Sequence, residues 1–539
     1  MSINIVPIQK LCTIKESKFM IRKLAATIAV AVLAIAVTII PSSAQNIPAG
    51  PPGTGFWVFW QLQNIDTTAG SVSMTAYEVE GGSANQVGSE SYALGLNSAL
   101  AYHPGLPVTF PNGDRIGFSS DVNFTRGSAV ISSDVDVVAI AQLGNNKSGE
   151  VGDPSGLGKA TSFYQGIGST NASTIVNFPL VKNDFNGQTT TFYIQSAGSD
   201  ADVTITYKMN DGTSHTESRT IGANRMWEFS PLNAAPAIAS GCSGGGATSP
   251  CQGAATVESS SGAIVGVVVE HPAQGVPVKL ALSTRGLTDA DQGTKLLAPI
   301  IKNAFNGSTT GFSVQNVGNA DATVKIDLTV TNAADASLIG NQYSETVTIA
   351  PGSAEIFIAA RNNLGGMPAG TFASATVEST NGQKLVGAVN ENNKGQKAVY
   401  AAFCTTGCGT ADTAATKTQI AAPLVKDFFN GKTTGLVVAN AGNAPTKMRA
   451  TYVDAAGVSR TIESSQDIPA GGAVSFFSVN TNPGGRFTAT GGVNFADFFN
   501  TKNSVTVEST TGQPIVAVAQ ESARDGTGLD IKNYEGFNY

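Results

Sequence analysis

One phrase is written three times in this chain of 539 residues. Its copies begin at residues 185, 305 and 429 and read FNGQTTTFYIQSAGSDADVTITY, FNGSTTGFSVQNVGNADATVKIDLTV and FNGKTTGLVVANAGNAPTKMRATY. Phe192, Phe312 and Leu436 hold matching positions, 120 and 124 residues apart. This spacing is too long for a solenoid repeat and suits a whole domain.

A second phrase recurs in step with the first. Its copies ATVESSSGAIVGVVVE, ATVESTNGQKLVGAVNE and VTVESTTGQPIVAVAQE end at Glu270, Glu391 and Glu521. FWQLQNIDTTAGSVSMTAY, with Trp60 in the matching position, and AVISSDVDVVAIAQ form an earlier, divergent copy. Two phrases in one order predict four tandem domains. We place them at residues 45–170, 171–288, 289–412 and 413–539, and call these segments copies 1 to 4.

The residue pattern inside a copy is that of β-structure. Phe312 and Val314 alternate with Ser313 and Gln315, which predicts a half-buried antiparallel strand. Gly and Asn in NVGNADA supply the turn that follows. We expect the second phrase to be a hairpin with Asn-Gly or Thr-Gly at its tip. Without a convincing amphipathic helix, the predicted fold is all-β, with two packed sheets in each copy.

The V-Q-N-x-G strand, the A-T-V-x-I strand, the P-G turn and the ATVES phrase together resemble the immunoglobulin-like repeats of bacterial secreted and cell-surface proteins, of the CARDB or invasin/adhesin type. This resemblance covers nearly all of the chain after residue 44. It implies four tandem immunoglobulin-like antiparallel β-sandwich domains. It also implies an extracellular structural or binding role, because such modules serve as spacers, adhesive stalks and surface-layer subunits. No residue-level site carries over from it.

The N-terminal segment is typical of a signal peptide. Arg22 and Lys23 precede an apolar run from residue 24 to 40, and small residues at 42–44 suit cleavage before Gln45. Residues 1–44 are therefore predicted to be removed, with Met1 or Met20 as the true start. A membrane helix is the alternative for this run. With cleavage, no membrane span is expected, and the protein is secreted and associated with the cell surface.

Cysteine use fits export. Cys242 and Cys251 lie in one Gly/Ser-rich stretch, and Cys404 and Cys408 lie in another. Close pairs in an exported chain predict two local disulfides, Cys242–Cys251 and Cys404–Cys408. Zinc bound by four thiolates is the alternative, but neither spacing is the two-residue zinc knuckle.

The charge balance of the chain limits which classes of binding partner are expected. The chain has 32 Lys and Arg against 39 Asp and Glu, and five of the basic residues precede residue 45. An acidic surface argues against a nucleic-acid partner. Only three His and 13% charged residues leave few groups for acid–base or metal chemistry.

The sequence contains no catalytic motif in the structural context that the motif requires. Gly241–Gly245 has the spacing of a serine-nucleophile elbow, but it lies in a Gly-rich loop and not between a strand and a helix. We therefore predict no enzyme and no cofactor. Asp289 and Asp291, between copies 2 and 3, are weak calcium candidates, and a solvated linker is the alternative.

The aromatic run Phe56–Trp60 is the most unusual local feature. In a strand, Trp57 and Phe59 point away from the face that carries residues 56, 58 and 60. Either packing covers both faces, or Trp57 and Phe59 form an interaction patch.

The sequence thus predicts an exported, non-enzymatic surface-layer, fibre or adhesin-like subunit of the cell surface or extracellular matrix that self-associates or binds surface components. The alternative is a secreted carbohydrate-binding protein that uses these aromatics.

Overall fold

A computed structural model describes residues 57–538 except 82–85, 97, 103–107, 110–114, 117–126, 146–159, 232–250, 273–281, 360–362, 394–395, 410–416, 455 and 524–530. Within this part of the chain the regular elements are β-strands and short helical turns, and the strands pair antiparallel. The chain is therefore all-β, as its alternating pattern predicted. The predicted signal peptide, residues 1–44, lies outside the described residues.

One four-stranded sheet occurs in every copy with the same strand order. We call these four the inner sheets. Their strands, in sheet order, are β4 (Ala99–Tyr102), β1 (Trp57–Asn64), β8 (Val137–Asn145) and β9 (Ala160–Gln165) in copy 1; β14 (Met226–Phe229), β11 (Gln188–Ser196), β16 (Ile264–Pro272) and β17 (Leu282–Arg285) in copy 2; β22 (Ala354–Phe357), β19 (Ser308–Asn316), β24 (Leu385–Asn393) and β25 (Gln396–Ala401) in copy 3; and β31 (Ala473–Phe476), β28 (Lys432–Asn440), β34 (Ile515–Ala523) and β35 (Ile531–Glu535) in copy 4.

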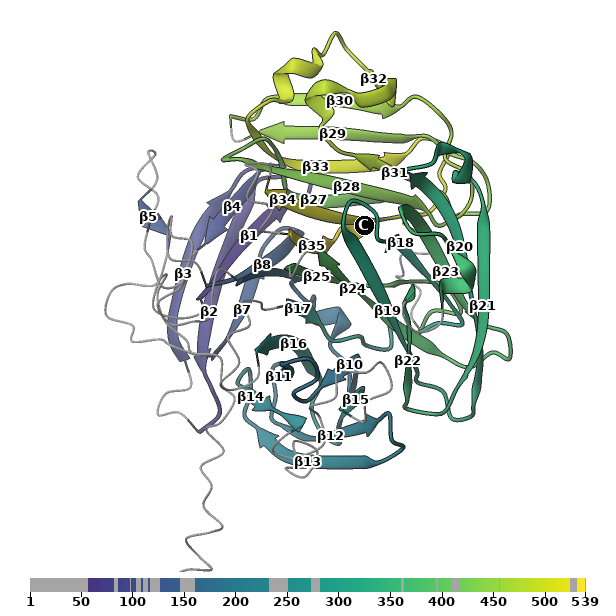
Figure 1. Ribbon diagram of the computed structural model, residues 1–539. Helices are drawn as coiled ribbons and strands as arrows, with labels where there is room; N and C mark the ends of the chain where they lie inside the picture. The colour runs from purple at the N-terminus through teal and green to yellow at the C-terminus, as the bar shows by residue number, and fades with distance from the viewer. Residues whose placement is uncertain are drawn as a thin grey trace, which may run out of the picture. The chain divides into compact units, whose positions relative to one another are not determined.

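Each copy has a second sheet, which we call its outer sheet (Figure 1). The strands, in sheet order, are β3 (Gln86–Leu94), β2 (Gly70–Glu78) and β7 (Gly127–Ser133) in copy 1; β10 (Ile175–Lys182), β15 (Gln252–Ser259), β12 (Ala201–Met209) and β13 (Ser214–Ile221) in copy 2; β21 (Gln342–Ile349), β20 (Ala322–Ala333), β23 (Thr371–Ser379), β18 (Lys295–Asn303) and β26 (Phe403–Thr406) in copy 3; and β32 (Phe487–Ala489), β30 (Ser459–Ser464), β29 (Met448–Asp454), β33 (Thr501–Ser509), β27 (Gln419–Asp427) and β36 (Phe537–Asn538) in copy 4.

The two sheets of a copy share one apolar core. In copy 2, Phe192 of the inner sheet and Val203 and Ile205 of the outer sheet belong to one buried cluster. Strand β12 alternates buried and half-buried or exposed residues along its length, because one face packs on the inner sheet and the other meets solvent. The alternation seen in the sequence therefore reflects a core between two sheets.

The expected hairpin in the second phrase is wrong. Strand β15, which holds ATVES, pairs with β10 and β12, whereas the next strand, β16, pairs with β11 and β17. The turn between β15 and β16 therefore carries the chain from the outer to the inner sheet. The strands of the first phrase, β11 and β12, likewise lie in different sheets. Both strands of each pair present an apolar face to the same core, which drives this crossing.

The FNG at the start of each first phrase forms a tight turn. Asn186 and Gly187 have φ of 52° and 69°, and the backbones of Phe185 and Gln188 exchange hydrogen bonds of 2.9 and 3.1 Å. Asn and Gly tolerate positive φ at both central positions, which this turn requires. The same letters recur because the backbone needs them.

The Asn that ends the first strand of the phrase clamps the turn that follows. Asn440 Nδ2 donates to the carbonyls of Ala444 and Ile468 at 2.7 and 3.0 Å, and its Oδ1 accepts from Gly442 N at 2.9 Å. Asn316 makes the same three contacts in copy 3, as does Asn64 in copy 1. A buried amide thus satisfies backbone groups that the change of sheet leaves without ladder partners.

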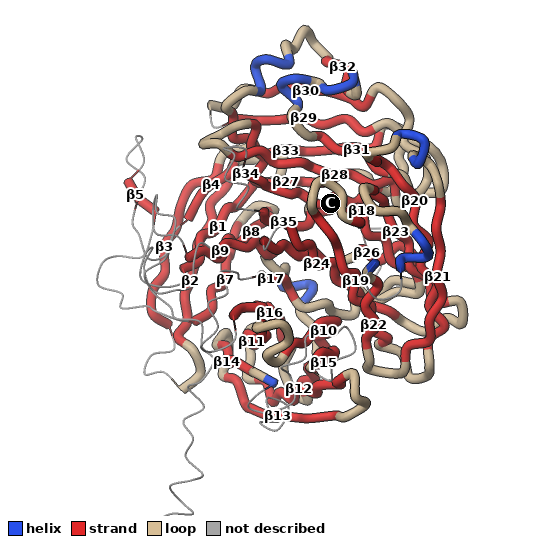
Figure 2. The backbone as a smooth tube through the Cα atoms, viewed as in Figure 1, coloured by secondary structure: helices blue, strands red, loops and turns tan. Residues whose placement is uncertain are grey.

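The four copies are in contact through the last strands of their inner sheets. Strand β9 contacts β17 and β35, and β25 contacts the same two strands, so the contacts form a closed circuit (Figures 1 and 2). Residues Ile47–Tyr539 accordingly group as one compact unit. In the described residues, no helix is long and apolar enough to cross a membrane.

Candidate functional site

The aromatic run lies in β1 of the copy 1 inner sheet. Trp57 and Phe59 pair with Gly144 and Gln142 of β8, but their side chains lie outside the described part. On the other face, Val58 packs against Leu143 and against Val269 of copy 2. Trp60 meets Tyr164 edge to face, with ring centroids 5.8 Å apart. The face with Val58 and Trp60 is thus partly buried, and the patch formed by Trp57 and Phe59 stays a prediction.

The two aspartates considered for calcium both have protein partners. Asp291 accepts two hydrogen bonds of 2.7 Å from the Arg285 guanidinium, and the Thr288 backbone N–H donates to it at 2.9 Å. Asp289 accepts from Ser173 and Gln292 at 3.2 and 2.9 Å. Among the described residues, no group of three His, Cys, Asp or Glu side chains is placed to hold a metal. The pairing of Asp291 with Arg285 favours a structural role.

One predicted disulfide is present. Cys404 and Cys408 are joined, with their Cα atoms 5.8 Å apart. Cys251 is also disulfide-bonded, while Cys242, its predicted partner, lies outside the described residues.

A buried Lys–Glu pair recurs in copies 2, 3 and 4. The glutamates that end the second phrase, on the inner sheets, form ion pairs with lysines near the C-terminal ends of the first outer-sheet strands. The pairs are Lys182–Glu270 at 2.8 Å, Lys302–Glu391 at 2.7 Å and Lys426–Glu521 at 2.7 Å. Each glutamate side chain is at most 5% exposed. Copy 1 lacks this glutamate. At the matching position of its strand register Leu143 lies opposite Val58, whereas copies 2, 3 and 4 have a glutamate opposite a threonine.

Sequence reasoning missed these pairs, although a signal was present. NFPLVK, LAPIIK and AAPLVK each end an apolar run with Lys182, Lys302 or Lys426, and each lysine stands three residues before the Phe of FNG. A lysine repeated within a buried strand requires a repeated counter-charge, because an unpaired buried charge is costly. The glutamate repeated at the end of the second phrase was that counter-charge.

The Glu270 carboxylate has two lysine partners from different copies. Lys182 of copy 2 and Lys397 of copy 3 approach it at 2.8 and 2.6 Å. Burial alone would raise the pKa of Glu270, but the two positive charges outweigh burial and hold that pKa at about 2. Glu270 is therefore ionised at neutral pH and ties copy 2 to copy 3.

We call the contact region between two neighbouring copies a seam. The seam between copies 3 and 4 has a side-chain amide in addition to the ion pair. Gln520 of β34 donates from Nε2 to Glu391 at 2.6 Å and accepts at Oε1 from Lys302 Nζ at 2.8 Å. Gln520 Nε2 also donates to Asn533 of β35 at 3.0 Å. Lys302, Glu391 and Gln520 therefore form a closed triangle of hydrogen bonds across the seam.

The last inner strands bring one residue each to a further polar cluster. Arg285 of β17 donates to Gln165 of β9 at 2.9 Å, and the Ala401 N–H of β25 donates to Glu535 of β35. Burial raises the pKa of the Glu535 carboxyl above its ordinary value, against the opposing charge of Arg285. Together with Asp291, these residues join all four copies where their strands meet.

In copies 3 and 4, the residue directly before Ala401 or Glu535 is a tyrosine that hydrogen-bonds to the outer sheet. Tyr400 Oη donates to the Ile300 carbonyl at 2.8 Å and accepts from its N–H at 3.0 Å, and Tyr534 bonds Leu424 in the same way. Copy 2 has Thr284 at this position, opposite Val268 as Tyr400 is opposite Val389. A cavity of about 30 Å³ lies there, lined by Thr284, Leu180 and, from copy 3, Val399.

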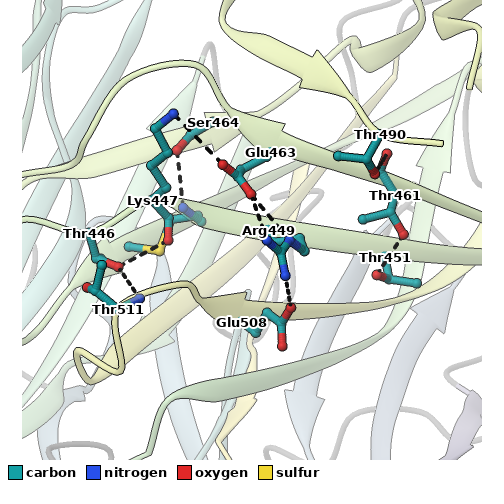
Figure 3. Close-up of polar contacts among 11 residues, drawn as sticks. Thr446, Lys447, Arg449, Thr451, Thr461, Glu463, Ser464, Thr490, Glu508 and Thr511 are labelled. Atoms are coloured by element: carbon teal, nitrogen blue, oxygen red, sulfur yellow. Dashed lines mark hydrogen bonds and ion pairs between the residues drawn. The ribbon is translucent and has the colours of Figure 1, made fainter. Parts of the chain in front are cut away.

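An exposed polar ladder crosses the outer sheet of copy 4 (Figure 3). Arg449 of β29 lies between Glu463 of β30 and Glu508 of β33, with N–O distances of 3.1 and 3.0 Å. Thr451 and Thr461 hydrogen-bond at 3.0 Å on the same sheet. Opposite charges and hydroxyls facing one another across strands stabilise a solvated sheet face.

Comparisons with known proteins leave the family open. No family model matches the chain, and no curated protein matches it. One similar solved structure is described as "Crystal structure of tetra-tandem repeat in extending region of large adhesion protein". The similarity covers 87% of this chain and 91% of that chain, at 12% identity and a TM-score of 0.10. At so low a TM-score the backbones do not superpose, and we take neither fold nor function from it.

Proposed function

We propose that this chain is an exported, non-enzymatic structural protein of the cell surface or extracellular matrix, which works by adhesion or self-association. In this proposal each copy is an immunoglobulin-like β-sandwich domain. The sharing of one core by two antiparallel sheets in copy 2 supports that assignment.

One observation carries the proposal: the residues that recur between copies are engaged in holding strands and copies together. Asn316 and Asn440 clamp turns, and Glu270 and Glu391 bind lysines or an amide across the seams between copies. Repetition of such residues builds a scaffold, whereas an enzyme needs reactive groups gathered at one open site. The polar outer sheets remain as surfaces for contact.

Export is supported by two features. The Cys404–Cys408 disulfide belongs to an oxidising compartment, in which such bonds persist. The sequence of residues 20–44 has the charged start, apolar run and small residues of a signal peptide.

The proposal is tested by expressing the full chain in a bacterial host with a Sec pathway, and by mass spectrometry and fractionation. We expect a mature N-terminus at Gln45 and protein in the cell-surface or extracellular fraction. Electron microscopy of the purified protein should then show filaments, lattices or surface-bound particles. Unprocessed protein in the cytoplasm would contradict the proposal. Monodisperse monomers that bind glycans, and lose that binding in Trp57→Ser/Phe59→Ser, would instead favour the carbohydrate-binding hypothesis.

A further inference from the structure

The seam between copies 3 and 4 places a lysine amine against a side-chain amide. Lys302 Nζ lies 2.8 Å from Gln520 Oε1 and 2.7 Å from Glu391 Oε1. The second oxygen of Glu391, Oε2, accepts from Gln520 Nε2 at 2.6 Å. One carboxylate therefore contacts both the amine and the amide nitrogen.

Lys302 and Glu391 are shielded from water, and Gln520 is half-buried. The side chains of Lys302 and Glu391 are 8% and 1% exposed, and the Lys302 ammonium lies 5.7 Å from the centroid of the Phe372 ring. Asn533 holds Gln520 Nε2 from the other side at 3.0 Å. The Glu391 carboxylate contacts Lys302 Nζ at 2.7 Å and is therefore placed to accept a proton from it. A neutral amine held beside an amide carbonyl is a nucleophile in place.

We propose that Lys302 and Gln520 join through an isopeptide bond that covalently ties copy 3 to copy 4. Glu391 accepts a proton from Lys302, and the freed amine attacks Gln520 Cδ. The Nζ–Cδ bond forms and the Cδ–Nε2 bond breaks. Two of the three ammonium protons of Lys302 pass through Glu391 to Nε2, so that an ammonium ion leaves. Nζ keeps one proton, Glu391 is again a carboxylate, and no oxidant or co-reactant is consumed.

The other two buried pairs show what this seam has in addition. Glu270 is bridged by Lys182 and Lys397, so a second cation occupies the place that the amide takes beside Glu391. Glu521 has Lys426 at 2.7 Å and Lys432 at 3.8 Å. In both cases the carboxylate is flanked by two lysine amines, and neither amine carries an amide carbon that the other could attack. The reaction is therefore assigned to Lys302, Glu391 and Gln520.

Intact mass of the folded, purified full chain tests the proposal, after reduction so that disulfides do not contribute. An N-terminal glutamine also loses ammonia when it cyclises, so the protein is made with one extra residue before Gln45. We expect a mass lower than the sequence mass by one ammonia. A tryptic map should contain a branched peptide that joins Lys302 to Gln520, with no cleavage after Lys302.

Three variants separate the reaction from simple packing. Glu391→Gln removes the proton carrier and should restore the full sequence mass, as should Lys302→Arg. Glu270→Gln removes an equally buried carboxylate at the neighbouring seam and should still lack one ammonia. A folded wild-type protein with the full sequence mass would overturn the proposal, as would ammonia loss that maps elsewhere. The result does not depend on where the protein works, so this test and that of the surface role can fail separately.

Discussion

At the scale of single residues, the repeated phrases are explained by buried polar groups. Asn440 and Glu521 are at most 1% exposed, and each bonds to groups that would otherwise be buried without a partner. Such groups tolerate little change, because an unpaired buried polar atom costs about 1–3 kcal/mol. This cost explains why the same letters return at the same positions in different copies.

The buried pairs should be worth much more than the exposed ones. Lys426→Met removes the nearer of the two lysines beside the buried Glu521 and should cost about 3 kcal/mol of unfolding free energy. Lys325→Met is the control, because the Lys325 and Asp327 side chains are 44% and 46% exposed and such pairs contribute about 1 kcal/mol or less. Urea unfolding of both variants measures the difference. Equal losses would show that burial of the Lys426 pair does not matter.

Acid should weaken the seam between copies 2 and 3. The pKa of Glu270 is about 2 in the folded protein, below its ordinary value of 4.5, so the ionised carboxylate is stabilised by folding. That stability is present above about pH 4.5, and it is lost as the pH falls toward about 2. Melting temperatures of wild type and Glu270→Gln, measured from pH 7 to 2, should therefore converge as the pH falls. A gap that stays constant or widens in acid would contradict this assignment.

At the scale of elements, the sequence predicted the strands and turns but not their pairing. Alternation in GFSVQNVG and the turn residues of NVGNADA follow from local chemistry, and β19 and the break between β19 and β20 bear both out. Whether two consecutive strands pair or cross to the other sheet depends on which edges a distant strand occupies. ATVES in β15 pairs with residues of β10 that lie about 80 positions earlier, and no residue within the phrase indicates this pairing. The hairpin expectation failed for this reason.

The turn clamp gives a prediction for one element. Asn440→Ala removes three hydrogen bonds, two of them to carbonyls near the buried turn, and should destabilise copy 4 by about 2–4 kcal/mol. Asn443→Ala changes an exposed residue of the same turn and should stay within about 0.5 kcal/mol. Thermal unfolding followed by circular dichroism compares them. Similar melting temperatures for the two variants would refute the clamp.

At the scale of the whole molecule, repetition predicted four copies but not the contacts between them. The residues that meet in the last inner strands differ from copy to copy: Gln165, Arg285, Ala401 and Glu535 hold the matching positions. A search for repeated letters cannot detect a contact made by unlike residues. The ionic pattern also breaks in copy 1, where Leu143 takes the place of the glutamate. The circuit of contacts therefore became visible only in the structure.

Contact between copies 1 and 4 closes that circuit and uses apolar packing. Phe163 of β9 lies edge to face with Tyr534 of β35 at 5.6 Å, and Val138, Ile140 and Phe163 belong to the buried cluster of copy 4. Val437 and Ala439 of copy 4 in turn join the cluster of copy 3. Cores that extend across copies should unfold together, because exposing one removes packing from the next.

Differential scanning calorimetry of the mature chain, residues 45–539, tests this account most directly. If buried pairs, shared cores and the circuit of last strands make the copies one body, the chain should unfold in a single transition whose calorimetric and van't Hoff enthalpies agree. Several separable transitions, or one whose van't Hoff enthalpy corresponds to a single copy, would mean that the copies unfold independently and would contradict the account.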